Sequence, residues 1–325
     1  MTGPLDSFGR SINYLRISVT DRCNLRCIYC MPPQGVPQIS HSEILSYEEI
    51  RTIAQAAAEL GINEVRLTGG EPLVRADLPE LVRMLSHIDE IRELVLTTNG
   101  TLLKNYARGL KQAGLSRVNV SLDTLKADRF RYITRQGKLE DVLEGIEAAK
   151  EAGLHPVKIN TVVMRGMNDD EILDFVRMTH EEGWHVRFIE LMPFKGAAES
   201  IPSVEVREHI SLLGKLEPCA SITGNGPAMY YRLAGAKGTI GFISPVSDPS
   251  FCSRCNRMRL TPDGELRPCL LGDDEIDLKM PLRNNASMEE LKRLILKAVA
   301  AKPKHHHLKE TNDRPVRRKM SQIGG

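Results

Sequence analysis

The chain has 325 residues, which is enough for one large α/β domain and a smaller appended one. Lys plus Arg (44) nearly balances Asp plus Glu (42), so a net charge of +2 gives no whole-protein argument for nucleic acid or an acidic membrane as partner. No apolar run approaches membrane-spanning length, and residues 1–10 lack the apolar segment of a signal peptide. We therefore expect a cytoplasmic protein whose cysteines are reduced or bind metal.

The first two hundred residues alternate short apolar runs with amphipathic segments. Ser46 to Glu49 has the pattern of a helix capping box, and Asn168 to Glu171 is expected to cap a later helix. Amphipathic helices are expected at residues 46–60, 77–88, 103–113, 139–152 and 168–183. Strands are expected at residues 15–19, 64–68, 94–98, 118–123, 157–163 and 186–191. Strict alternation implies a parallel sheet, and six units are too few for a closed eight-stranded barrel. We predict an incomplete (β/α)6 TIM-like barrel with polar residues gathered at its strand ends.

The pattern changes after Lys195, where Gly, Pro and Ser become frequent. Short β-like runs appear at residues 230–233 and 239–243, and a final amphipathic helix is expected at residues 288–301. We predict a barrel domain at residues 1–200 and a smaller C-terminal domain at residues 201–325. The run His305–His307 is expected to be a solvated loop.

Three cysteines, Cys23, Cys27 and Cys30, follow directly on the first expected strand. Three thiolates on one loop can bind three irons of a cubane cluster and leave the fourth iron open. A structural zinc loop is the alternative, but zinc normally takes four ligands and no fourth Cys or His stands nearby. The C-x3-C-x2-C spacing, with Tyr29 before the last cysteine and Gly69-Gly70-Glu71-Pro72 after the second strand, resembles the radical S-adenosylmethionine superfamily.

A second group consists of Cys252, Cys255 and Cys269, with the spacing C-x2-C-x13-C. It predicts a second 4Fe–4S cluster with an open iron, while structural zinc remains an alternative. Arg257 and Arg259 follow it, and residues at i and i+2 of an extended segment point to the same side. Their forked guanidinium groups suit phosphate oxygens, but the spacing alone slightly favours a solvated basic strand.

Both cysteine groups, the segment Gly241–Val246, the run Cys255–Thr261 and the Gly-Gly terminus together resemble the GTP 3′,8-cyclase family over nearly the whole chain. The resemblance implies that Tyr29, Gly70, Ser121 and Met192 contact S-adenosylmethionine. It also implies that GTP is contacted by Arg16, Arg66, Thr97, Lys158, Arg187, Arg257, Met258 and Arg259. Arg257, Arg259, Gly324 and Gly325 are the residues expected to take part in catalysis. The alternative for the glycines is a frayed chain end.

The resemblance further implies two 4Fe–4S clusters and S-adenosylmethionine as cofactors. Cleavage of S-adenosylmethionine to methionine and a 5′-deoxyadenosyl radical would let the radical take the 3′ hydrogen of GTP, and the sugar radical would attack C8 of guanine. The product would be (8S)-3′,8-cyclo-7,8-dihydroguanosine 5′-triphosphate, the first intermediate of molybdenum cofactor biosynthesis. Expected partners are an electron donor of the flavodoxin or ferredoxin type and cyclic pyranopterin monophosphate synthase, which would receive the product. The protein is expected to be a monomer or homodimer that binds neither nucleic acid nor membrane.

Two other functions stay open at this point. One is a radical S-adenosylmethionine peptide maturase with an auxiliary cluster, although such a protein usually has more cysteines after Cys269. The other is a non-catalytic iron–sulfur or zinc protein that transfers electrons or binds a partner.

Overall fold

The computed structural model describes residues 3–192, 199–306 and 318–324, and its strands form one twelve-stranded sheet. The six expected strands lie side by side in chain order and are all parallel, which confirms the α/β barrel-like fold. They are β1 (Tyr14–Ser18), β2 (Glu64–Thr68), β3 (Glu93–Thr98), β4 (Arg117–Ser121), β5 (Lys158–Val163) and β6 (His185–Glu190).

Two strands from the C-terminal third extend this parallel sheet. β10 (Arg257–Leu260) pairs with β1, and β9 (Ile240–Ile243) pairs with β6, both in parallel. Antiparallel strands follow on each side: β11 (Glu265–Arg267) and β12 (Ile276–Asp277) beyond β10, and β8 (Met229–Arg232) and β7 (Glu217–Cys219) beyond β9. Within the described residues β7 and β12 do not pair, so the barrel stays open. Because the sheet runs across residue 200, the domain boundary expected there stays a prediction.

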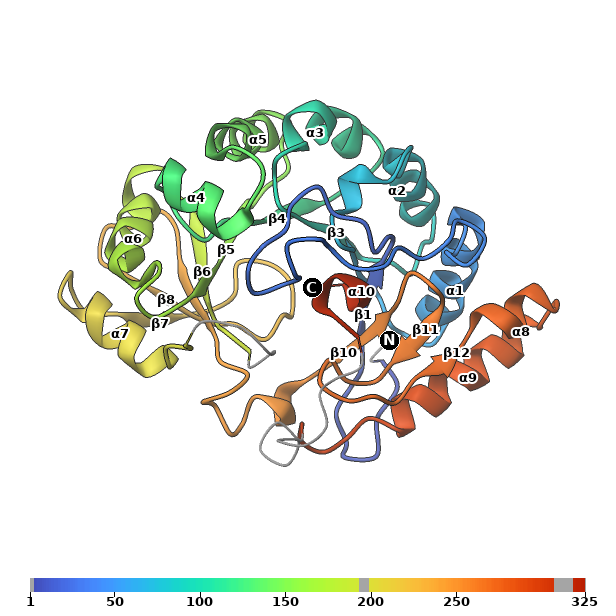
Figure 1. Ribbon diagram of the computed structural model, residues 1–325. Coiled ribbons are helices and arrows are strands. Elements are labelled where there is room, and N and C mark those ends of the chain that lie inside the picture. Colours follow the sequence, from blue (N-terminus) through green and yellow to red (C-terminus); the bar gives the residue numbers. More distant parts are fainter. Residues whose placement is uncertain (1–2, 193–198, 307–317, 325) are drawn as a thin grey trace.

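Helices cover the outer face of the curved sheet, and α10 lies within its concave side (Figure 1). The expected helices are α1 (Tyr47–Glu59), α2 (Leu78–Ser86), α3 (Leu103–Gln112), α5 (Leu139–Glu151), α6 (Ile172–Glu181) and α9 (Met288–Ala300). The sequence patterns did not predict α4 (Ala127–Thr134), α7 (Ser203–Ser211), α8 (Lys279–Arg283) and α10 (Met320–Ile323). None of the helices in the described part of the chain is long and apolar enough to cross a membrane.

The two expected caps have different outcomes. Ser46 and Glu49 form the capping box, since the Ser46 Oγ accepts from the Glu49 N–H at 3.1 Å and the Ser46 N–H donates to Glu49 Oε2 at 2.7 Å. Asn168 does not cap α6, because a short 3-10 turn (Asp169–Glu171) comes first. Its side-chain amide instead donates to the carbonyl oxygens of Asp123 and Val162, which ties two strand ends together.

The alternation of side chains along each strand separates the core from the barrel interior. In β2, Val65 and Leu67 belong to the apolar core. Arg66 and Thr68 alternate with them along the strand and point into the barrel, where they line a cavity. The fold therefore buries its apolar side chains between sheet and helices and leaves a polar interior for ligands.

Candidate active site

A cavity of about 310 Å³ runs through the barrel, and all six cysteines of the two groups line it. The parallel register explains this arrangement. Cys23, Cys27 and Cys30 follow β1 and therefore lie at the carboxyl edge of the sheet. Cys252 and Cys255 precede β10, which is parallel to β1, and therefore lie at the amino edge. The antiparallel strand β11 then brings Cys269 back to the same edge.

The loop that carries the first cysteine group is held by residues at the end of β3. The Asn99 side-chain amide donates to Asn24 Oδ1 at 2.9 Å and approaches Cys23 Sγ at 4.0 Å. Burial raises the pKa of Cys23 to about 11 and that of Cys30 to about 12. These groups would stay protonated at neutral pH as free thiols, and binding of a metal cluster would displace their protons.

The second cysteine group lies beside positive charge. Burial raises the pKa of Cys255, but Arg257 and Lys302 outweigh burial and lower this pKa to about 6. The Lys302 ammonium is itself held by two carbonyl oxygens, those of Arg257 at 2.8 Å and Pro268 at 2.7 Å. Cys255 is therefore prepared to act as a thiolate ligand.

Both cysteine groups fit clusters of several irons. Among the described residues, no three His, Cys, Asp or Glu side chains are placed to hold a single metal ion. In a cubane cluster each thiolate binds a different iron, so the sulfurs surround the cluster rather than converge on one atom. Three thiols on one loop at the carboxyl edge, and three at the amino edge, provide such donor sets.

The four residues expected at S-adenosylmethionine, Tyr29, Gly70, Ser121 and Met192, all line the cavity. The Tyr29 hydroxyl donates to Asp123 Oδ2 at 2.6 Å, which fixes its ring beside the first cysteine group. At Gly70 a Cβ atom would lie 2.4 Å from the carbonyl oxygen of Arg22. Only glycine lets these two backbone segments approach so closely.

Six of the residues expected at GTP also line the cavity: Arg16, Arg66, Thr97, Arg187, Arg257 and Arg259. Arg16 lies at the centre of the basic cluster, because the sheet register places it beside Arg66 on one side and Arg259 on the other. Burial, followed by neighbouring cations, lowers the pKa of Arg187 and of Arg259 to about 10. Within the described residues, Arg66 Nε and Arg187 Nε and Nη2 are buried without a hydrogen-bond partner. Buried cations with unused donors are costly without an anion, so this interior fits a phosphate-rich ligand.

Three further expected residues are not among those that line the cavity. Lys158 begins β5 at the amino edge, and its ammonium donates to the Thr223 carbonyl at 2.8 Å. Burial, followed by the charge of Arg117, lowers the pKa of Lys158 to about 6. Met258 is fully buried in the apolar core, since it alternates with Arg257 and Arg259 along β10. Gly324 lies beside the arginines, and its carbonyl accepts from Arg16 Nη2 at 3.0 Å and Arg259 Nη1 at 3.2 Å. Gly325 lies outside the described residues.

Sequence reasoning missed four cavity residues. Glu71 is fully buried and accepts from Leu73 N, Thr98 Oγ1 and Asn99 N at 3.1, 2.6 and 2.6 Å, so it ties the ends of β2 and β3 together. Asp123 supports Tyr29 at the end of β4. Lys302 and His306 lie near the second cysteine group. The expectation of a solvated loop is wrong for His306, whose Nε2 is 2.7 Å from the Pro245 carbonyl. The position of Glu71 in the Gly-Gly-Glu-Pro motif and that of Asp123 at the end of an expected strand were usable signals, whereas Lys302 and His306 had none.

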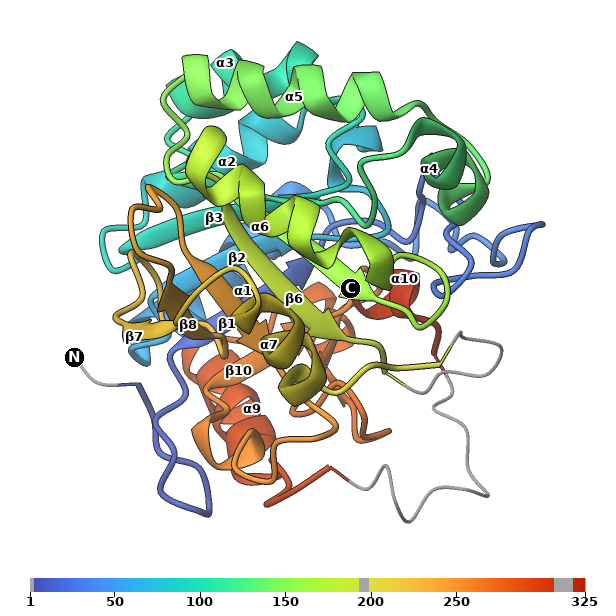
Figure 2. The ribbon, with the colours of Figure 1, turned by 90° about the vertical axis from the view of Figure 1, so that its left-hand side faces the viewer.

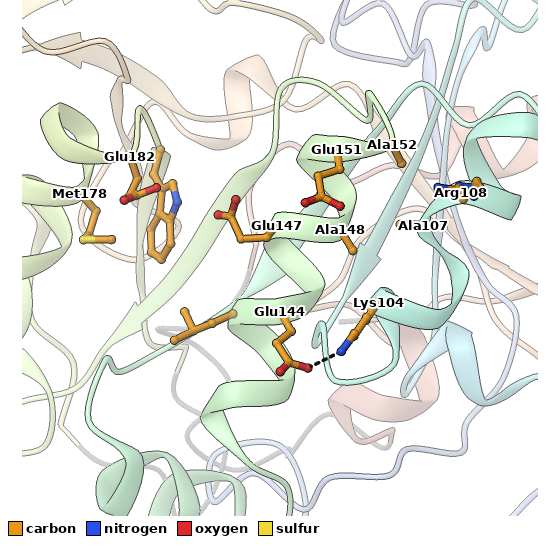
Figure 3. Close-up of a pocket in the computed structure, with 12 residues that line it drawn as sticks. Lys104, Ala107, Arg108, Glu144, Glu147, Ala148, Glu151, Ala152, Met178 and Glu182 are labelled. Carbon is orange, nitrogen blue, oxygen red and sulfur yellow. Dashed lines mark hydrogen bonds and ion pairs between the residues drawn. The ribbon is translucent and has the colours of Figure 1, made fainter.

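A larger hollow of about 790 Å³ lies elsewhere, among α3, α5 and α6 (Figure 3). Its lining includes Lys104, which donates to Glu144 at 3.0 Å, together with Glu147, Glu151 and Glu182. No cysteine or glycine-rich turn is part of its lining. The candidate active site is therefore the smaller cavity inside the barrel.

Comparison with known families agrees with this geometry. The model of the radical SAM superfamily matches residues 17–179, and that of Molybdenum Cofactor Synthesis C matches residues 184–308. The crystal structure of Streptococcus suis SuiB bound to S-adenosylmethionine has the same fold, with a TM-score of 0.63 at 13% identity over 94% of this chain and 75% of that one. The fold and the two cysteine groups define a radical S-adenosylmethionine enzyme.

Curated relatives give the particular family. The GTP 3′,8-cyclase of Moorella thermoacetica is 56% identical over 98% of this chain and 99% of its own length. That of Desulforamulus reducens is 51% identical over 99% of this chain and 100% of its own length. The chain belongs to the GTP 3′,8-cyclase family, which removes the peptide maturase and the non-catalytic protein as alternatives.

Proposed function

We propose that the barrel cavity converts GTP into (8S)-3′,8-cyclo-7,8-dihydroguanosine 5′-triphosphate, the first step of molybdenum cofactor biosynthesis. The observation that carries the proposal is the position of the two cysteine groups at opposite edges of one cavity, with buried arginines between them. The cysteine group at one edge suits the cluster that cleaves S-adenosylmethionine, and the group at the other edge suits the cluster that binds the guanine base. The arginines between them suit the triphosphate. Family membership at 56% identity supports the same reaction.

The first cluster and S-adenosylmethionine would supply the carbon radical at the carboxyl edge of the sheet. The second cluster would supply an open iron for the guanine base at the amino edge. The chain contributes position and shielding. Tyr29, held by Asp123, and Gly70, packed on Arg22, shape the S-adenosylmethionine side. Arg66, Arg187 and Arg259 are nine-tenths buried or more, so their charges act on the triphosphate with little solvent screening. A nucleotide fixed at its phosphates has its ribose held in one place, which favours abstraction of a single hydrogen.

Mass spectrometry after anaerobic incubation of the dithionite-reduced, cluster-loaded protein with S-adenosylmethionine tests this function. GTP should raise 5′-deoxyadenosine formation, and a product with the mass of GTP but a different retention time should appear. A Cys255→Ser variant should lose the product. Cys219 in β7 belongs to neither group and does not line the cavity, so Cys219→Ser should leave the product unchanged. Loaded protein that yields no isomer of GTP would refute the function.

We further propose a cytoplasmic enzyme, monomeric or homodimeric, that takes electrons from a flavodoxin or ferredoxin type donor. Its product would pass to cyclic pyranopterin monophosphate synthase. Six thiols that must stay reduced for cluster assembly support a reducing compartment. Replacing dithionite by reduced flavodoxin or ferredoxin should sustain turnover, and analytical ultracentrifugation of the loaded protein would give its oligomeric state.

A further inference from the structure

The described end of the chain is packed inside the open barrel. Helix α10 lies within the curve of the sheet in both views of the molecule (Figures 1 and 2). Ser321 and Ile323 are buried. Gly324 has a φ of 77°, and a Cβ atom there would lie 2.8 Å from Thr68 Cγ2 and 3.1 Å from Ser18 Cβ. Both the positive φ and the close contacts require glycine at this position, so the tail has one defined position in the cavity.

The tail lies beside residues of both proposed ligand sites. Ser321 lines the same cavity as Cys30, which belongs to the first cysteine group. The Gly324 carbonyl accepts from Arg16 and Arg259, and also from Thr68 Oγ1 at 3.4 Å. The tail therefore lies between the first cysteine group and the arginines.

Arg318 fastens the start of this tail to the rest of the protein. Its guanidinium donates to both oxygens of Asp263, at 3.0 and 2.9 Å, and to both oxygens of Glu275, at 2.7 and 3.0 Å. The side chains of all three residues are largely buried, with exposures of 19%, 23% and 23%. Bidentate, partly desolvated ion pairs of this kind are stronger than exposed ones.

The two carboxylates are themselves fixed. Asp263 lies in the turn between β10 and β11 and accepts from the Thr261 hydroxyl at 2.6 Å. Glu275 also pairs with the buried Arg267 of β11. The hairpin that carries Arg259 thus also holds Arg318. A helix of four residues such as α10 has little stability of its own, so its position depends on such anchors.

We infer that Arg318 is a positioning residue that holds the chain end in the cavity, with the Gly324 carbonyl on Arg16 and Arg259. Its importance for turnover rests on the proposed function, whereas its hold on the tail does not. Ile323 anchors the tail at its inner end by apolar burial, and Arg318 does so at its outer end by charge.

Carboxypeptidase digestion of the cluster-loaded protein, followed by mass spectrometry, measures how often the tail leaves this position. Arg318→Ala should lose its terminal glycines about tenfold faster than the unmodified protein, because the open state becomes more populated. Arg318→Lys keeps the charge but not the fork, and should fall between the two. Arg293→Ala, which removes an exposed pair on α9, serves as the matched control and should be trimmed at the original rate.

The partner residue gives an independent check. Asp263→Asn should also speed trimming, and adding it to Arg318→Ala should have little further effect, since both changes remove the same contact. Trimming of Arg318→Ala at the original rate, in protein with normal cluster content, would overturn the inference. So would full additivity of the two changes.

Steady-state kinetics then test the consequence for the reaction. With the tail released, kcat should fall about tenfold while KM for GTP does not rise, because Arg16 and Arg259 stay in place on their strands to bind phosphate. Unchanged kcat in a variant whose tail is trimmed quickly would overturn the positioning role. A protein that forms no GTP isomer at all, yet shows the expected trimming pattern, would refute the proposed function and leave the hold of Arg318 intact.

Discussion

Two buried arginines of the barrel, Arg187 and Arg117, should respond oppositely to the same substitution. Arg187 is 3% exposed, and its Nε and Nη2 have no hydrogen-bond partner among the described residues. Arg117 is 2% exposed and pairs with Glu93 at 2.6 Å and Glu64 at 3.8 Å. We predict that Arg187→Met stabilises the GTP-free protein and weakens GTP binding, whereas Arg117→Met destabilises the protein.

The size of the effect at Arg187 follows from its pKa, which burial lowers from 12.5 to about 10. At about 1.4 kcal/mol per unit of pKa, the buried charge costs about 3 kcal/mol. The lowered value lies far above neutral pH, so folded and unfolded chains are both protonated there. The cost is therefore fully present at pH 7 and declines only as the pH rises above about 10. Methionine keeps most of the apolar stem volume.

The same change should weaken GTP binding roughly ten- to a hundredfold, because a charged hydrogen bond contributes about 1.5–3 kcal/mol. Arg117→Met leaves two carboxylates without their cation and should cost about 3 kcal/mol. Urea unfolding of the GTP-free protein and isothermal titration with GTP measure both quantities. Destabilisation by Arg187→Met, or stabilisation combined with unchanged GTP affinity, would refute the assignment of Arg187 to an anion site.

Three further predictions concern single residues, Gly70 and Glu71 in the cavity and Lys158 beside its arginines. Gly70→Ala should lower the stability of the protein by about 1–3 kcal/mol and weaken S-adenosylmethionine binding, since the new Cβ meets the Arg22 carbonyl. Equilibrium dialysis measures the binding, and circular dichroism checks that the variant is folded; unchanged affinity in a folded variant would contradict the prediction. GTP binding at pH 8 should take up about one proton in the unmodified protein and none in Lys158→Met, because the pKa of Lys158 is about 6 without ligand and phosphate raises it. Calorimetry in buffers of different ionisation enthalpy measures this uptake, and equal values in both proteins would contradict it. Glu71→Gln replaces one acceptor oxygen by a donor facing Asn99 and should lower stability by about 1–3 kcal/mol, with faster iron loss to a chelator; unchanged iron retention would count against a role for Glu71 in holding the first cysteine loop.

Local patterns predicted the six consecutive strands and most outer helices, because each βα unit is encoded by nearby residues. They could not predict that β9 and β10 join the same sheet. β10 pairs with β1, more than two hundred positions away in the chain, and no periodicity records such a register. Helix α4 was missed because it is only 8 residues long and is followed by Arg135 rather than by a glycine that would mark its end.

The candidate site was predicted unevenly for a similar reason. The cysteine groups and the Arg257–Arg259 step have spacings that can be read directly, and the structure places all of them on one cavity. Side chains alternate along β10, so Met258 points into the core instead of the cavity. Lys158 lies at the start of β5, where its side chain donates to the Thr223 carbonyl. The positions of Lys302 and His306 depend on where the chain returns after α9, which only the tertiary fold determines.

Because the two cysteine groups lie at opposite edges of the sheet, the site selects ligands by their length as well as by their charge. The five residues of β1 separate the two edges by roughly 16 Å. A free base or a short phosphate ester bound at one edge cannot approach the other, whatever its affinity for the arginines. Only an extended molecule bound beside a second one spans the distance between the two edges, so a small molecule that binds at one edge cannot react with a group at the other.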